Sequence, residues 1–449
     1  MDRRKFLQLS AVAGGAFTAV GTMSGQTPSG KTLAAEPSTP VSPAPMLDFA
    51  APKIERPRVG ILGCGCRGSF TVVRMREYDF CEITAVCDLL PERANEKADW
   101  VTHRKNNPRP DVYTGEEGWK KMCAADNVDV IYNCGPWSLH APANIFAMEH
   151  GKHVGCELPL GLTVDECWRQ VETSERTQRH CMLLENYCYM ENMLLGLNAT
   201  RQGAIGKLTH GECGYVHELV GVKLAGQTWR TEYSKTHTGN PYTTHGLGPM
   251  AMILNLNRGD TMDFLVSVSS APMIINDLAK RMYPNDNTYY KLGDMNTSII
   301  RTVNGKTILL RHDTHTPRPA QWFDYVQGDC GIIADHPLRV ALRPKQETWL
   351  TAEELAAFKK QYDHPVWTEL GKSAEDGMAH HHGGSDPVMD ARFLGAIREG
   401  RPTDISVYDS ALWSCLTELT EKSVLSGSQP VKIPDFTRGA WKTAGPAIL

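Results

Sequence analysis

Short apolar runs alternate with amphipathic segments from residue 58 to about residue 190. The runs are continuous rather than alternating, as expected for parallel strands with both faces covered, and they span residues 58–63, 82–87, 128–135, 152–157 and 180–186. Helix-like stretches, among them 91–104, 141–150 and 164–178, lie between them. Repeated β-α units with short connections predict a doubly wound parallel sheet over residues 58–190.

The pattern changes after a helix expected at residues 190–203. Longer strands with alternating polar and apolar positions are expected at 206–220, 262–272 and 296–312, with a hairpin turn at Val303–Lys306. Residues 386–400 and 405–427 have helical patterns again. We therefore predict an α/β fold in which residues 191–449 form a second, α+β domain on a large, mostly antiparallel open sheet.

The N-terminal residues MDRRKFLQ place Arg3 and Arg4 before a mildly apolar, glycine- and alanine-rich stretch. This order is typical of a bacterial twin-arginine export signal. We interpret residues 1–34 as that signal and residues 35–57, rich in proline and serine, as a disordered linker. The expected location is the periplasm or another exported one, without stable membrane insertion once the signal is cleaved.

Composition and net charge limit the fold classes and the binding partners that we expect. The chain of 449 residues is 41% hydrophobic and 22% charged, which suits two globular domains. A formal net charge of −4 gives no reason to expect nucleic acid or an anionic membrane surface as a partner. The 13 cysteines form no C-x-x-C pair, and several lie in strand-like runs, so we expect reduced, buried thiols and no disulfides.

A G-x-G-x-x-G run follows the first predicted strand and opens a helix. Its glycines permit a tight turn and a close approach of a pyrophosphate to the helix N-terminus. Asp88 ends the second strand, where a carboxylate accepts from ribose hydroxyls and repels a 2′-phosphate, so NAD is the predicted cofactor. Trp137 and His140 follow the third clear strand and are expected to line the nicotinamide-ribose side.

With these residues identified, nearly everything after residue 57 resembles the GFO/IDH/MocA superfamily and, within it, glycoside hydrolase family 109. The resemblance rests on the order and spacing of GCGCRG (63–68), CDLLPERA (87–94), PWSLH (136–140), CELPLGLTVDECW (156–168), LEN (184–186), WR (229–230), YTTHGLGP (242–249), NRGD (257–260), HDTHTPRP (312–319), HHGGSDPVMD (381–390) and PDFTRGAWK (434–442). Members of that family are α-N-acetylgalactosaminidases that use a bound NAD.

The resemblance implies a redox-assisted glycosidase acting on terminal N-acetylgalactosamine. NAD takes hydride from C3 of the sugar, the ketone acidifies the C2 proton, and a base removes that proton. The aglycone then leaves C1 by elimination, water adds, and the same NADH returns the hydride. Because the cofactor is not consumed, the mechanism suits a protein exported away from any exchangeable pool.

The resemblance also assigns roles to single positions. The NAD positions are Gly63, Gly65, Cys66, Arg67, Gly68, Asp88, Trp137, Ser138, Leu139, His140, Glu157, Leu158, Asn186 and Tyr242. The substrate positions are Tyr215, Arg230, Tyr242, Thr243, Thr244 and His245. His245 also occupies the slot of a catalytic histidine, which suits transfer of the C3 hydroxyl proton. Tyr187 or Tyr189, beside Asn186, is the candidate base at C2.

Two positions depart from the patterns of these families. Superfamily dehydrogenases carry Glu-Lys-Pro where this chain has Leu158 between Glu157 and Pro159, which argues against simple alcohol dehydrogenation. Family 109 commonly has a sugar-contacting tyrosine where this chain has Ala320, with Trp322 and Tyr325 as candidate replacements.

Two alternative functions and the oligomeric state stay open at this point. One alternative function is a periplasmic NAD(P)-bound sugar oxidoreductase, and another is a sugar binder without catalysis. No metal site is predicted, because the adjacent residues His380–His382 before Gly383 suggest a tight turn rather than ligands of one ion. A homodimer is one expectation, since an open antiparallel sheet often pairs with a copy of itself.

Overall fold

The computed structural model describes residues 45–449 except 104–106, 227–228, 346 and 372–380, without the side chains of residues 322, 324 and 381. The predicted signal at residues 1–34 lies outside the described residues. Residues 45–57, in contrast, correct the prediction of a disordered linker. Met46 and Leu47 are buried in the core, and the amide of Ile54 donates to the carbonyl of Ile397 at 3.2 Å. Apolar side chains that find a covered surface order this part of the segment.

The first sheet has six strands, in the order β3-β2-β1-β4-β5-β6. All five neighbouring pairs are parallel, which confirms the doubly wound prediction. Its strands are β1 (Arg58–Leu62), β2 (Glu82–Asp88), β3 (Asp111–Thr114), β4 (Val130–Asn133), β5 (His153–Cys156) and β6 (Cys181–Leu183). Its helices are α2 (Cys66–Met75), α3 (Pro91–Thr102), α4 (Gly118–Cys123), α5 (Trp137–Glu149) and α6 (Val164–Thr177). The sequence analysis did not predict β3, because none of its four residues is buried and they form no apolar run.

The strand order reverses between β1 and β4, and ligands of such sheets bind outside the carboxyl ends of the strands at that reversal. The loop after β1 is the predicted Gly-rich turn, and the loop after β4 leads into Trp137. Two motifs 70 residues apart therefore meet at one edge of the sheet.

The second sheet has eight strands, in the order β13-β12-β11-β7-β10-β9-β8-β14. Only the pair β10–β7 is parallel among its described pairings, which confirms a mostly antiparallel sheet. The strands are β7 (Leu208–Val216), β8 (Met262–Ser269), β9 (Met295–Thr302), β10 (Thr307–Asp313), β11 (Gln321–Gly328), β12 (Gly331–Ala334), β13 (Arg339–Leu342) and β14 (Val431–Lys432). The predicted hairpin turn joins β9 to β10.

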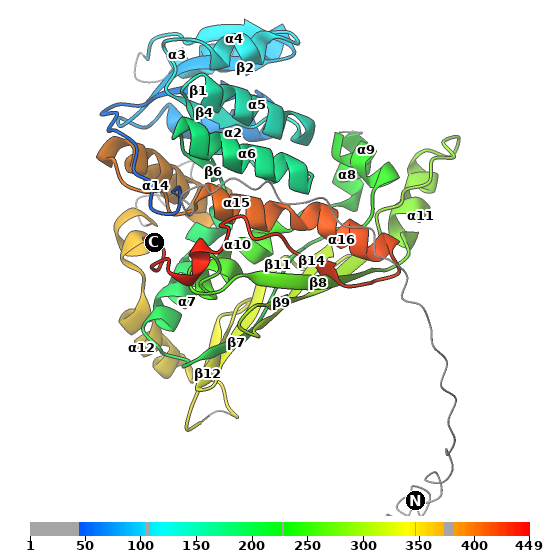
Figure 1. Cartoon of the computed structure of the whole chain (residues 1–449). Coiled ribbons are helices and arrows are strands. Elements are labelled where there is room, and N and C mark those ends of the chain that lie inside the picture. Colours follow the sequence, from blue (N-terminus) through cyan, green and yellow to red (C-terminus); the bar gives the residue numbers. More distant parts are fainter. Residues whose placement is uncertain (1–44, 104–106, 227–228, 346, 372–380) are drawn as a thin grey trace, which may run out of the picture. The chain divides into compact units, whose positions relative to one another are not determined.

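The remaining α-helices follow β6 in the chain, and α7 connects the first sheet to the second. They are α7 (Glu191–Arg201), α8 (Val220–Gly226), α9 (Trp229–Thr236), α10 (Thr244–Ile253), α11 (Met273–Met282), α12 (Ala352–Tyr362), α14 (Ser385–Glu399), α15 (Val407–Ser414) and α16 (Leu416–Leu425). Figure 1 shows α15 and α16 running between the sheets, where α15 packs on α6 and β6 and α16 packs on β8. The predicted domain boundary at residues 190/191 stays a prediction.

All 13 cysteines are free thiols, and most of them are buried, as the apolar strand pattern predicts. Cys66 and Cys330 are the exposed ones. Within the described ranges, no helix is both long and apolar enough to cross a membrane.

Candidate active site

The three glycines of the turn after β1 have different spatial demands. Gly63 has a φ of +87°, and a Cβ there would lie 2.6 Å from the carbonyl oxygen of Cys134. A Cβ on Gly68 would lie 1.8 Å from the carbonyl oxygen of Gly63. A Cβ on Gly65 would meet no protein atom within 4 Å. Packing of the chain thus explains the first and third glycines, and the open space before Gly65 leaves room for a ligand.

This difference yields a paired prediction. Gly65→Ala is expected to keep the thermal stability of the parent protein but to lower its content of co-purified NAD, because the added methyl group enters ligand space. Gly68→Ala is expected to destabilise the protein itself, because its Cβ collides with backbone. Thermal unfolding and the nucleotide released on denaturation measure both effects. A Gly65→Ala protein that retains full NAD content would contradict this location of the pyrophosphate.

Asp88 is held in place by backbone donors. The amide of Cys64 donates to Oδ2 at 2.8 Å, and the amide of Leu90 donates to Oδ1 at 3.0 Å. The carboxylate therefore lies beside the Gly-rich turn at the end of β2. A carboxylate at this location fits recognition of the ribose hydroxyls of NAD.

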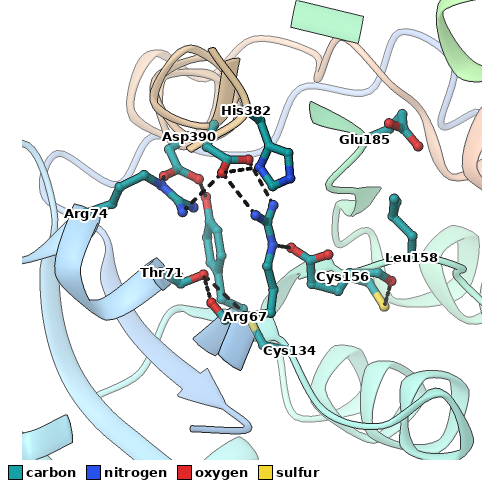
Figure 2. A network of polar contacts seen from close by, with 12 residues as sticks. Arg67, Thr71, Arg74, Cys134, Cys156, Leu158, Glu185, His382 and Asp390 are labelled. Atoms are coloured by element: carbon teal, nitrogen blue, oxygen red, sulfur yellow. Dashed lines mark hydrogen bonds and ion pairs between the residues drawn. The ribbon is translucent and has the colours of Figure 1, made fainter. Parts of the chain in front are cut away.

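Arg67 on α2 takes part in an ion-pair network, shown in Figure 2. Its Nε donates to Glu157 at 2.5 Å, and its Nη1 and Nη2 donate to the two oxygens of Asp386 at 3.0 and 2.9 Å. Asp386 also accepts from Nδ1 of His382 at 3.1 Å. Arg67 and Glu157 are thus brought together, as residues of one site should be. Their charged groups, however, neutralise each other and Asp386.

The network continues into the core through Arg74. Its Nε donates to Asp390 at 2.8 Å, and its Nη1 lies 3.5 Å from Asp386. Tyr78 and Tyr132 donate hydroxyl hydrogen bonds to Asp390 at 3.1 and 3.3 Å. Helix α2, which carries the Gly-rich turn, is in this way joined to α14 from the far end of the chain.

The loop after β4 is braced by its own side chains. Nε1 of Trp137 donates to the carbonyl of Leu158 at 2.8 Å. Both ring nitrogens of His140 face carbonyl oxygens, of Pro159 at 2.5 Å and Gly135 at 3.1 Å. His140 therefore shapes the crevice and offers no ring nitrogen to a cofactor. Ser138 is exposed at the N-terminus of α5, whereas Leu158 is buried, so the Glu-Leu-Pro position presents an apolar surface.

His245, at the start of α10, forms the centre of the predicted chemistry. Its Nδ1 lies 2.7 Å from Oε1 of Glu185, which also accepts from the amide of Tyr187 at 3.2 Å. The rings of Tyr187 and His245 are 4.0 Å apart. Burial lowers the pKa of His245, while the carboxylate of Glu185 opposes that effect. The histidine is thus oriented and buried next to a phenol.

The two tyrosine candidates for the C2 base have different surroundings in the structure. Tyr187 contacts His245, and burial raises its pKa, with further contributions from Tyr215 and Tyr242. Tyr189 is fully buried, and its hydroxyl donates to Asp404 at 3.2 Å, on the side of Arg392. The prediction of Tyr189 as a base is therefore corrected, because its hydroxyl is used in the core.

Aromatic residues from four segments surround the predicted substrate positions. The rings of Tyr215 and Tyr242 are 4.4 Å apart, and both lie within 5.2 Å of the His245 ring. The guanidinium of Arg230 lies 5.6 Å from the Tyr242 ring and 5.8 Å from the Trp137 ring. Tyr215, Arg230, Tyr242 and His245 are therefore brought together, as predicted.

The two threonines differ from that group. Thr243 donates to the carbonyl of Trp413 at 2.6 Å and is fully buried, so its side chain anchors the turn before α10. Thr244 is buried and its hydroxyl has no hydrogen-bond partner among the described residues, which leaves it available to a ligand. Ala320 is exposed, and the hydroxyl of Tyr325 donates to Glu212, so Tyr325 does not replace the missing tyrosine.

Several buried polar atoms that have no hydrogen-bond partner in the described part of the chain indicate where a cofactor and a sugar would bind. They are Oε2 of Glu185, Nδ2 of Asn186, Nε of Arg230 and Oγ1 of Thr244. A buried polar atom left unpaired costs about 1–3 kcal/mol, so such a group beside a crevice is expected to meet a ligand. Together with the open space before Gly65 and the anchored Asp88, these atoms fit NAD.

Sequence reasoning missed three residues of this region. Glu185 is part of the LEN motif, but its hydrogen bond to His245 spans 60 positions. Asp386 is part of the HHGGSDPVMD segment, but Arg67, the residue that it binds, lies 319 positions away. Lys223 lies outside all the motifs that the sequence analysis identified. Among the described residues, no group of three or more His, Cys, Asp or Glu side chains is arranged to hold a metal ion, and His380 lies outside those residues.

Comparison with known proteins assigns the family. Residues 189–443 match the family described as "Glycosyl hydrolase 109, C-terminal domain", and residues 57–185 match "Oxidoreductase family, NAD-binding Rossmann fold". The chain belongs to glycosyl hydrolase family 109. It is therefore an enzyme of a glycosidase family with an NAD-binding Rossmann domain.

Two relatives that are named for an enzymatic activity align with most of this chain. An α-N-acetylgalactosaminidase of Bacteroides fragilis is 41% identical over 409 residues, which cover 88% of this chain and 96% of that protein. An α-N-acetylgalactosaminidase of Shewanella oneidensis is 39% identical over 461 residues and covers 99% of this chain and 98% of its own.

Solved structures share the fold. A levoglucosan dehydrogenase in complex with NADH and L-sorbose has a TM-score of 0.64 at 17% identity, covering 85% of this chain and 100% of its own. An NAD-binding oxidoreductase from Klebsiella pneumoniae has a TM-score of 0.65 at 14% identity with the same coverage. The pairing of a parallel and a mostly antiparallel sheet is thus the arrangement of these proteins.

Proposed function

We propose that this protein is an exported glycosidase that hydrolyses terminal N-acetylgalactosaminides, of the α configuration, by a redox-assisted mechanism. The observation that carries the proposal is the buried His245–Glu185 pair, which contacts Tyr187 and faces the aromatic substrate cluster. The relatives named α-N-acetylgalactosaminidase support the sugar and its anomer. Leu158 in place of a lysine argues against the alternative, a sugar oxidoreductase.

When bound, NAD supplies a reversible hydride acceptor for C3 of the sugar and a cationic ring in the crevice. His245 takes the proton of the C3 hydroxyl, because Glu185 orients its ring and stabilises the imidazolium that forms. The neutral imidazole is the dominant form near pH 7, since burial lowers the pKa of His245. The same residue returns the proton to C3 at the end of the cycle.

Tyr187 is the proposed base at C2, the carbon next to C3. Its ring contacts His245, so one sugar ring can reach both residues. Burial raises the pKa of Tyr187, so the phenolate needs a cationic neighbour before it can accept the C2 proton. After that transfer, the C1–O bond to the aglycone breaks. Water then adds at C1, and C2 recovers a proton.

Hydrolysis without added cofactor tests this function. The purified protein should release p-nitrophenol from the α-N-acetylgalactosaminide with no NAD in the buffer, and denaturation should release bound nucleotide. In deuterated water the product should carry deuterium at C2. The β anomer and the sugar without the N-acetyl group serve as matched substrates. Hydrolysis without deuterium at C2 would contradict the mechanism, and net reduction of NAD would indicate an oxidoreductase.

Export by the twin-arginine route is a proposal that rests on Arg3 and Arg4. Changing both to lysine is expected to keep the protein in the cytoplasm, whereas the parent chain reaches the periplasm. Immunodetection in cell fractions measures this. Equal distribution of the two forms would exclude the route.

The homodimer also stays a prediction. Val268 on β8 and Ile299 on β9 are exposed, at 55% and 56%, on adjacent antiparallel strands. Their exposed apolar side chains suit contact with a second sheet. Analytical ultracentrifugation of the parent protein and of Ile299→Lys checks this, with a monomeric variant as the expected result.

A further inference from the structure

A lysine that no motif indicated lines the predicted sugar cavity. The cavity is partly open to solvent, and Trp137 and His312 also line it. Its wall includes Tyr215, Arg230 and Tyr242, three predicted substrate residues, and also Lys223. Lys223 lies on α8, which pairs with α9 at the end of the second sheet in Figure 1. The mechanism described above does not use this residue.

The amine of Lys223 is hydrogen-bonded to a neutral side chain. Its Nζ donates to the hydroxyl of Thr314 at 2.5 Å, and none of the carboxylates in the described residues forms an ion pair with it. Asp313 is the nearest source of negative charge, but its Oδ1 already accepts from the amides of His315 and Thr316, at 3.2 and 2.9 Å. An ammonium without a counter-ion in a cavity wall is costly, which favours a functional role.

The groups that face Lys223 make it easy to deprotonate. Burial and the charge of Arg230 on α9 together lower the pKa of Lys223 to about 7, against the opposing charge of Asp313. His217 after β7, and His312 and His315 from β10 and the loop after it, are the other titratable neighbours. Burial lowers the pKa of all three histidines, so they are neutral near pH 7. The lysine can therefore give and take a proton near neutrality.

The other titratable groups of the cavity wall cannot do this near neutral pH. Burial raises the pKa of Tyr215 to about 12 and also raises the pKa of Tyr233 and Tyr242. The pKa of His312 lies well below its usual value because of burial. Arginine does not deprotonate in proteins, which excludes Arg230. Lys223 is left as the acid–base group of the cavity wall.

We propose that Lys223 is the catalytic acid for the departing aglycone. As the C1–O bond breaks, its ammonium donates a proton to the glycosidic oxygen, so the aglycone leaves as a neutral alcohol. The amine then takes a proton from the water that adds to C1, which restores the ammonium. This inference rests on the proposed redox-assisted elimination, because it assigns the proton that such an elimination must supply.

Leaving-group dependence tests the inference. Lys223→Met should lower kcat/KM for methyl α-N-acetylgalactosaminide by about 10²–10⁴-fold, because methoxide leaves poorly without a proton. The same variant should hydrolyse the 2,4-dinitrophenyl glycoside nearly as fast as the parent, since that phenolate leaves unaided. Lys223→Arg keeps the charge but cannot release the proton, so it should not rescue the methyl glycoside.

The parent protein provides a second readout that needs no variant. With the methyl glycoside, activity requires the ammonium, so it should be present at low pH and lost as pH rises through about 7, the pKa of Lys223. With the dinitrophenyl glycoside this basic limb should be absent. Lys235→Met on α9, where the native amine pairs with Glu232, is the matched control and should leave both substrates unchanged.

The outcomes separate the two proposals. Equal losses with both glycosides, or rescue by arginine, would show that Lys223 serves binding or structure and would overturn its acid role. Absence of deuterium at C2 in the parent protein would instead overturn the proposed function. Thermal unfolding and NAD content of each variant confirm that the compared proteins are folded and loaded.

Discussion

Replacing His245 with asparagine is expected to lower kcat by about 10²–10⁴-fold, the usual contribution of a positioned acid–base group. The loss follows because the imidazole, held by Glu185 at 2.7 Å, is the group placed to take the C3 hydroxyl proton. Asparagine preserves a polar contact to Glu185, so the fold and the bound NAD should be retained. Steady-state kinetics, thermal unfolding and NAD content measure the effect.

A control and a pH profile make this prediction specific. His210→Asn on β7, where the native ring bonds to Thr307, should leave kcat unchanged. Because the neutral imidazole is the base, activity with the dinitrophenyl glycoside, which needs no proton from Lys223, should fall only as pH drops below the usual histidine pKa of about 6.5. Glu185 raises the pKa of His245 against burial, so Glu185→Gln should move this acid limb to still lower pH. An unmoved limb would show that another group controls it.

Replacing Asp386 with leucine is expected to be the most destabilising single change in the region. It removes the carboxylate that accepts from Nη1 and Nη2 of Arg67 and that lies beside Nη1 of Arg74, so these buried donors lose their charged partner. Breaking a buried pair from one side costs about 3–5 kcal/mol. Denaturant unfolding measures the loss, and co-purified NAD should fall too, because α2 carries the Gly-rich turn.

Two further variants test the origin of that loss. Glu399→Gln, at the exposed end of α14, should change stability by no more than about 0.5 kcal/mol. Arg67→Met combined with Asp386→Leu should lose less stability than the sum of the two single losses, because each single change already removes the same Arg67–Asp386 ion pair. If the double variant lost the sum of both single losses, the ion pair would not be the cause.

The network also has a pH signature. Although burial would raise the pKa of Asp386, the charges of Arg67 and Arg74 lower it well below its usual value. A carboxylate with a lowered folded pKa stabilises the protein above its unfolded pKa, near 4. That contribution is lost as pH falls through the folded pKa. The Asp386→Leu protein should therefore lose less stability between neutral and acid pH than the parent does.

Local patterns were enough to predict the first sheet, the cofactor turn and the class of cofactor. Continuous apolar runs indicate strands covered on both faces. In the Gly-rich turn, a Cβ on Gly63 or Gly68 would collide with backbone, whereas Gly65 leaves open space for a ligand. The short strand β3 has no buried residue, and β11 to β13 lacked a clear alternation, so no pattern indicated them. The apolar residues Met46 and Leu47 were not predicted to be buried, because they lie in a proline-rich segment.

The choice between Tyr187 and Tyr189 needed the tertiary structure. Both residues lie in the short 3-10 helix Asn186–Tyr189, and one turns to His245 while the other turns to Asp404. Neither direction is encoded in the spacing of the two tyrosines. It depends on which elements pack on each side of the turn.

The amino-acid sequence by itself determined the two-sheet architecture, the NAD turn and the residue types of the site, because these depend on local backbone preferences and on side-chain periodicity. Only the tertiary structure decided the partners of Arg67, which is bound to a carboxylate 319 positions away, and the low pKa of Lys223. Charge state depends on burial and on distance to other charges, and long-range packing sets both.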